Sequence, residues 1–365
     1  MKGYVPNARM VIIDACFTGS FHLDDYISGH YIFSPGRTMV VKANSVNTLQ
    51  DIWTDELAGL LDLGVSAGNW AKGQMTLESH LMGDPTYRYI PSRKDLENLD
   101  EDIVLKKGDQ NFWRRMMKDT NPEVKSLAMK MLFLSGGIST DELLRIQQEE
   151  TRATVRLQAF NLINKTYDHN LVPSITLGMR DNYELLRRMA ALKAGGNLSP
   201  ELLDEMMEIS LSPGESQRVV FELNSAIENY KKEDVLTSFD KVVSGENNIW
   251  YKKKDDLRKR LEYTLSRTEK EFQELTIDTI PAKSKKFTIT SLRNSNNATY
   301  LETLYSFFRE SSDPELKVLL AEAFGWYTNS WKREEIIDKC KELLVSEKDD
   351  SVRKELKRTI NRLQY

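Results

Sequence analysis

The chain has 365 residues, enough for two ordinary domains, and its 40% hydrophobic and 29% charged residues indicate a folded protein. Its net charge of −4 gives no reason to expect nucleic acid or an anionic membrane as a partner. No apolar run approaches the roughly 20 residues that a membrane helix needs, and the N-terminal sequence MKGYVPNARM lacks the form of a signal peptide.

The sequence does not indicate a metal or cofactor site. Cys16 and Cys340 are the two cysteines, too few for a disulfide framework or a four-cysteine zinc site, so they leave the compartment open. The histidines show no ligand-like spacing and the chain has no phosphate-loop pattern. We therefore expect neither metal nor cofactor.

Residues 1–95 alternate strand patterns with helix patterns. The predicted strands are Val11–Ile13, Thr38–Val41 and Tyr87–Ile90, and the predicted helices are Trp53–Leu63 and Ala67–Leu81. Short β-branched runs are typical of buried parallel strands. The alternation predicts an α/β fold with a parallel sheet and flanking helices.

Residues 109–365 show helix patterns only, with an internal repeat. Lys125, Arg156, Arg187 and Arg218 follow one another at intervals of 31 residues. Apolar residues recur around the first of them with helical spacing, at Val124, Leu127, Ala128, Met131 and Leu132. The register predicts an α-solenoid, and the alternative is a bundle of unrelated amphipathic helices.

A second helix is expected in each repeat unit. These helices are predicted around Asp141–Leu144, Val172–Leu177, Pro200–Leu203 and Glu233–Leu236. The helix starts Asn121–Lys125 and Asp313–Lys317 share the order Asn or Asp, Pro, any residue, apolar, basic, which resembles HEAT repeats. Residues 244–297 are expected to be an insertion, with one long charged helix at Lys252–Glu274 and an irregular stretch at Ile277–Asn297.

Cys16 is the candidate reactive residue. The segment Val11–Phe21, VIIDACFTGSF, leads a predicted strand directly into this cysteine, which is followed by small residues. The strand would place the thiol at the carboxyl edge of a sheet, where chemistry collects in open α/β folds. Backbone N–H groups there stabilise a thiolate and an oxyanion. The alternative is a cysteine that acts as a small buried hydrophobic residue.

This segment resembles the catalytic-cysteine strand of the gingipain family, which belongs with the caspases. The resemblance continues through Met39–Asn47, through Trp53 and the helix after it, and ends at Gly83–Thr86, which is similar to the Gly-Asp-Pro-Ser/Thr signature of the family. It covers about residues 8–90. It implies the C-terminal part of a caspase-like peptidase domain, fused here to HEAT-like repeats.

The resemblance implies a cysteine endopeptidase that acts on a protein or peptide substrate. Cys16 would be the nucleophile, and its backbone N–H would contribute to the oxyanion hole. Asn44, Ser45, Val46, Asn47 and Trp53 would bind the substrate residue before the cleaved bond. The alternatives are a helix-capping turn for the loop and a core position for Trp53.

The resemblance also implies a general-base histidine on a strand before the cysteine strand, and none of residues 1–10 is a histidine. His22 and His30 follow Cys16, and we expect His80 to be structural and His169 to lie on the surface. Without further strands the Val11–Ala15 strand would expose an unpaired edge. We therefore expect a fragment of a longer peptidase that is inactive alone, ahead of a pseudo-peptidase or a partner chain that supplies the missing strands.

The competing function is a scaffold in which the repeats hold a protein partner and the peptidase segment is vestigial. Gingipain-type enzymes are usually exported, which suggests a secreted or cell-envelope parent. The sequence itself indicates neither the compartment nor the cleavage preference.

Overall fold

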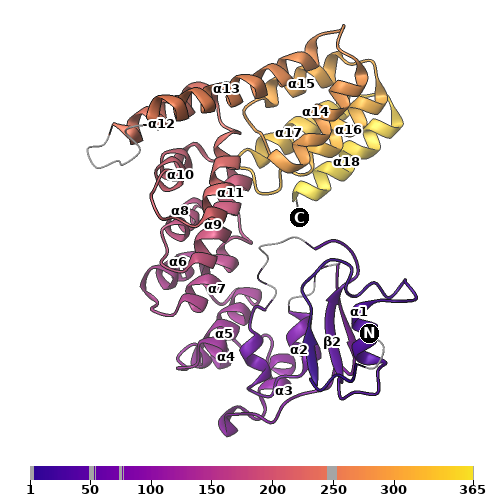
Figure 1. Cartoon of the computed structure of the whole chain (residues 1–365), viewed down its shortest axis with the longest axis vertical. Helices are drawn as coiled ribbons and strands as arrows, with labels where there is room; N and C mark the ends of the chain where they lie inside the picture. Colours follow the sequence, from indigo (N-terminus) through magenta and orange to yellow (C-terminus); the bar gives the residue numbers. More distant parts are fainter. Residues whose placement is uncertain are drawn as a thin grey trace. The chain divides into compact units, whose positions relative to one another are not determined.

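The computed structural model describes residues 4–48, 53, 55–73, 76, 78–244 and 253–364 (Figure 1). The chain divides into two compact units, Met1–Asp168 and His169–Tyr365. A small sheet and the first helices form the first unit, and helices alone form the second within the described residues. The part of the chain that the structure describes contains no helix long and apolar enough to cross a bilayer.

The sheet of the first unit has three strands in the order β1 (Met10–Ile12), β2 (Val40–Asn44), β3 (Ser79–Gly83). β1 runs parallel to β2 with Met10 opposite Val40, and β3 runs antiparallel to β2 with Ala43 opposite His80. The sheet is therefore mixed, and the expectation of a purely parallel sheet is wrong. The strands predicted near Val11 and Thr38 are present, and β2 extends to Asn44.

Three predicted elements near the sheet differ from the structure. The segment Tyr87–Ile90 is not a strand, and β3 takes its place beside β2. The helix expected over Ala67–Leu81 ends at Lys72 in α2 (Ala67–Lys72), because Gly73 closes it and the chain then enters β3; residues 74, 75 and 77 lie outside the described residues. Of the helix expected over Trp53–Leu63, the described residues form the short 3-10 helix η1 (Ala58–Leu61), and residue 54 lies outside the described residues.

One apolar core runs from the sheet region into the first helices of the repeats. The remaining helices of the first unit are α1 (Ile27–Ile32), η2 (Lys94–Leu96), α3 (Leu99–Leu105), α4 (Gln110–Met116), α5 (Pro122–Leu134), α6 (Thr140–Glu149) and α7 (Ala153–Ile163). Trp70 of α2, Leu99 and Trp113 share this core with Leu127 and Ile163. The expected boundary between residues 95 and 109 therefore lies inside a continuous core.

Helix α5 follows the predicted pattern closely. Asn121 caps its N-terminus by accepting hydrogen bonds from the N–H groups of Glu123 and Val124, and Pro122 occupies the first turn. The five residues of the predicted apolar stripe are each at most 5% exposed. Within this unit α5 packs on α7 and α6 packs on α7.

The second unit continues with paired helices. They are α8 (Leu171–Met179), α9 (Glu184–Asn197), η3 (Pro200–Leu202), α10 (Leu203–Ser210), α11 (Gln217–Ile227), α12 (Lys232–Val243), α13 (Lys254–Gln273), η5 (Glu274–Thr276), α14 (Ala282–Ser295), α15 (Leu301–Glu310), α16 (Pro314–Phe324), α17 (Arg333–Ser346) and α18 (Asp350–Gln364). α9 packs on α11 and α10 on α12, as neighbouring repeats of a solenoid do (Figure 1). The expected second helices are all present.

One repeat position varies in this unit, and one predicted element differs from the structure. Phe221, three residues after Arg218, is 67% exposed, whereas the equivalent Ala190 is buried, and α11 buries Val219 and Leu223 instead. The stretch Ile277–Asn297 is not irregular, because α14 buries Ile289 and Leu292 and ends where Asn296 adopts a left-handed conformation. The long charged helix is present as α13.

The repeating basic residues join neighbouring helix pairs. Lys125 binds Glu150, Arg187 binds Glu215 at 3.0 Å and Lys317 binds Glu347 at 3.0 Å, and each glutamate precedes the first helix of the next pair. Arginines at this position also donate to a backbone carbonyl six residues earlier, as Arg353 does to Glu347 at 2.8 Å. The basic residue therefore recurs because it fixes the turn that begins each helix pair.

The ion pair between Lys317 and Glu347 provides a test of this connection between helix pairs. Burial alone would raise the pKa of Glu347, but hydrogen bonds from backbone N–H groups and from Lys317 hold the pKa below its ordinary value. The stabilisation is therefore present at neutral pH and is lost as the pH falls below about 4.3. We expect Glu347→Gln to lower the free energy of unfolding by about 1–3 kcal/mol at pH 7 and by much less at pH 3, measured by urea denaturation.

Glu342→Gln in α17, the helix that ends directly before Glu347, is the matched control. Its pair with Lys339 is solvent-exposed, with 64% of the glutamate side chain accessible, so the substitution should change stability by less than about 0.5 kcal/mol. Equal losses of unfolding free energy for the two variants, or a loss for Glu347→Gln that does not depend on pH, would contradict the stabilising role of this ion pair.

Candidate active site around Cys16

The parallel pairing of β1 with β2 places the ends of both strands at one edge of the sheet. Cys16 follows β1 at this edge and is exposed to solvent. The chain then turns sharply, with Phe17 in a left-handed conformation at φ 61°. Gly19 packs so closely on β2 that an added Cβ would lie 3.0 Å from the carbonyl carbon of Ala43. A small residue is therefore required three positions after the cysteine.

The turn after Cys16 is held against the segment that follows β2. The N–H of Phe17 donates to the Val46 carbonyl at 3.2 Å, and that of Gly19 donates to the Asn44 carbonyl at 2.7 Å. The Thr18 hydroxyl closes the turn by donating to the Ala15 carbonyl at 2.9 Å. These bonds fix the backbone on both sides of the cysteine.

The Cys16 sulfur lies beside the backbone of Thr48. The Thr48 N–H donates to Sγ at 3.4 Å, and the thiol faces the Thr48 carbonyl oxygen at 3.7 Å. An N–H group directed at sulfur stabilises thiolate charge. Among the described residues, the backbone N–H of Cys16 has no acceptor, so it is available to a bound oxyanion.

Of the five predicted pocket residues, Val46 and Asn47 are exposed and the other three are partly or fully buried. Asn44 is 5% exposed and its amide donates to Asp14 at 3.1 Å, so it lies behind the cysteine. The Ser45 hydroxyl lies 2.7 Å from His80 Nε2. Val46 and Asn47 are exposed beside the Cys16 turn, whereas Trp53 is half-buried. The structure thus brings Val46 and Asn47, together with Thr48, to the thiol.

A buried lysine that the sequence analysis did not single out lies behind this edge. Lys42 of β2 is 5% exposed and its ammonium lies 5.1 Å from the Trp70 ring centroid. Burial lowers the pKa of Lys42, while the carboxylates of Asp14, Asp55 and Glu56 oppose that shift. Asp14, which accepts a hydrogen bond from the Asn44 amide, is therefore also one of the carboxylates that favour the charged form of Lys42. Alternation along β2, which places residues 42 and 44 on one face, was the available signal.

Within the described residues, no histidine bonds to Cys16. His30 pairs with Asp25 at 2.5 Å, and His80 packs against Phe21 at a ring distance of 5.0 Å while it bonds Ser45. His22 contacts the ring of Phe21. Among the described residues, the exposed Cys16 thiol therefore has no histidine beside it that could act as a general base.

Comparisons with protein-family models and with curated proteins find no match for this chain.

The two cysteines should differ sharply in reactivity. Cys16 is exposed, whereas Cys340 is buried in the core of the second unit and burial raises the pKa of its thiol to about 12. Iodoacetamide at pH 8 should therefore modify Cys16 and leave Cys340 unmodified until the protein is unfolded in guanidinium. Peptide mass spectrometry measures both sites, and native modification of Cys340 at a similar rate would contradict the structure.

Proposed function

We propose that residues 8–90 are the C-terminal part of a gingipain-type, caspase-like cysteine peptidase domain, with Cys16 as its nucleophile, and that the helices after it form a HEAT-like repeat array. The proposal rests mainly on one observation, the exposed position of the Cys16 thiol at the edge of the sheet. A strand delivers Cys16, exposed, to the carboxyl edge of a parallel strand pair, with a free backbone N–H and the Val46–Thr48 segment beside it.

The proposed reaction is amide hydrolysis through a thioester. The general-base histidine that this mechanism requires would take the Cys16 thiol proton, the thiolate would attack the scissile carbonyl carbon, and the Cys16 N–H would help to hold the oxyanion. The C–N bond would then break as the histidine returns that proton to the leaving amine. Water then hydrolyses the thioester. The exposed segment Val46–Asn47 would contact the substrate backbone before the cleaved bond.

Among the described residues β1 pairs with β2 alone, and this open edge supports a larger sheet in the active enzyme. β1 pairs on one side with β2, and its sequence Met-Val-Ile carries none of the charges or prolines that protect ordinary edge strands. Ile12 of this strand is 41% exposed, which is unusual for a large apolar residue of a sheet. We propose that a strand added at this edge completes the sheet and supplies the general-base histidine.

A peptide-directed alkylating probe tests the proposal on the chain as it is. At pH 9 an ordinary thiol is largely ionised, so labelling does not need the absent base. Among dipeptidyl acyloxymethyl ketones that vary in the residue next to the ketone, at least one should modify Cys16 with saturating kinetics. We expect it to react ten-fold or more faster than the same ketone without a peptide, measured by mass spectrometry.

Two variants make this test specific. Cys16→Ala should abolish labelling, and Val46→Asp should slow the peptide ketone while leaving iodoacetamide labelling of Cys16 unchanged. If every peptide ketone reacts at the rate of the peptide-free ketone, the edge does not bind substrate. A scaffold role for the repeats would then be the better account.

A further inference from the structure

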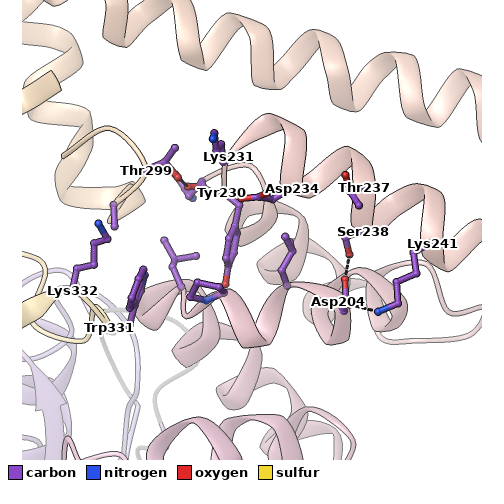
Figure 2. A pocket seen from close by; sticks show the side chains of 15 residues that line it. Asp204, Tyr230, Lys231, Asp234, Thr237, Ser238, Lys241, Thr299, Trp331 and Lys332 are labelled. Atoms are coloured by element: carbon purple, nitrogen blue, oxygen red, sulfur yellow. Dashed lines mark hydrogen bonds and ion pairs between the residues drawn. The ribbon is translucent and has the colours of Figure 1, made fainter. Parts of the chain in front are cut away.

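The second unit contains a cavity of about 600 Å³ that is separate from the cysteine site in sequence and in chemistry (Figure 2). It lies among η3, α10, α12 and the loops before α12, α15 and α17. Its volume falls in the range of ligand-binding pockets. Leu198, Leu203 and Ala298 contribute apolar surface to it.

Hydrogen bonds between distant segments hold the walls of this cavity in place. The Tyr230 hydroxyl donates to the Ser199 carbonyl at 2.8 Å, and the Thr299 hydroxyl donates to the Asn229 carbonyl at 2.8 Å. The backbone N–H of Trp331 donates to the Asn197 carbonyl at 2.9 Å. The cavity is therefore formed before any ligand arrives, which lowers the entropic cost of binding.

The charges at one end of the cavity are already neutralised. Asp204 accepts hydrogen bonds from Ser238 at 2.6 Å and from Lys241, as Figure 2 shows. Hydrogen bonds from these two side chains lower the pKa of Asp204, so its carboxylate is satisfied within the protein. This end offers no free charge to a ligand.

The other end combines an exposed aromatic ring with lysines. Trp331 is 48% exposed and the Lys332 ammonium lies 5.4 Å from its ring centroid, while Lys332 also approaches Glu335 at 3.2 Å. Lys231 lines the same cavity and has no ion-pair partner among the described residues. Asp234 is the opposing carboxylate on this side.

We propose that this cavity binds a peptide segment of a partner protein in which an aromatic or large aliphatic side chain is flanked by carboxylates. The apolar side chain would pack on Trp331 and the apolar floor, and the carboxylates would face Lys231 and Lys332. Asp234 in the lining opposes a continuous polyanionic nucleic acid backbone more than it opposes two spaced carboxylates, which favours a peptide. The inference does not depend on the activity of Cys16.

Fluorescence anisotropy with labelled heptapeptides tests this proposal on the whole chain. The probes are Gly-Glu-Gly-Phe-Gly-Glu-Gly, its counterpart with lysine in place of glutamate, and its counterpart with serine in place of phenylalanine. The acidic phenylalanine peptide should bind at least ten-fold more tightly than either counterpart. Eight-residue oligothymidylate is included as the nucleic acid probe.

Matched variants locate the binding. Trp331→Ala and Lys231→Glu should each weaken binding five-fold or more. Trp326→Ala and Lys283→Glu should not, because Trp326 is 47% exposed and Lys283 is an exposed lysine without an ion pair in the described chain, and both lie outside the cavity. Circular dichroism melts verify that all four variants fold.

Three results would overturn the proposal. The first is equal binding of the acidic and basic peptides, and the second is equal weakening by cavity variants and control variants. The third is Trp331-dependent binding of the oligonucleotide without binding of the peptide, which would assign the cavity to nucleic acid.

Discussion

The parallel pairing of β1 with β2 is the constraint on which the rest of the cysteine site depends. Because parallel strands end at the same edge, this one ladder brings the turn that carries Cys16 against the segment after Asn44. The backbone bonds from Phe17 and Gly19 then fix the thiol beside Thr48. A slip of one residue in this register would turn the side chains of β1 to the opposite face and remove these bonds.

The sheet is stable because it does not stand alone. Short strands gain stability by packing a hydrophobic face against helices, and here the core continues through Trp70 and Trp113 into α5 and α7. The Lys130 ammonium, from α5, also binds Glu56 at 2.9 Å and the Gly73 carbonyl at 2.8 Å. Buried charge and apolar packing therefore tie the site-bearing segment to the first helices of the array.

The sequence predicted the elements with strong periodicity and missed those decided by tertiary contacts. The α5 stripe and the Asn121 cap follow local rules, so they were predictable. β3 was not, because Ser79–Gly83 becomes a strand only through its ladder with β2. Cys16 was predicted from its place after a strand and from the family resemblance, whereas the contacts of Lys42 with Trp70 and of Thr48 with Cys16 come only from the fold. Family membership and peptidase chemistry remain proposals.

Amide hydrogen exchange along β1, followed by nuclear magnetic resonance, tests the central claim most directly. The pairing register directs the N–H groups of Val11 and Ile13 toward β2 and those of Met10 and Ile12 away from it. We expect slow exchange at Val11 and Ile13 and fast exchange at Met10 and Ile12. Fast exchange at all four residues would mean that the strand presenting Cys16 does not form, and slow exchange at all four would mean that its edge is not free.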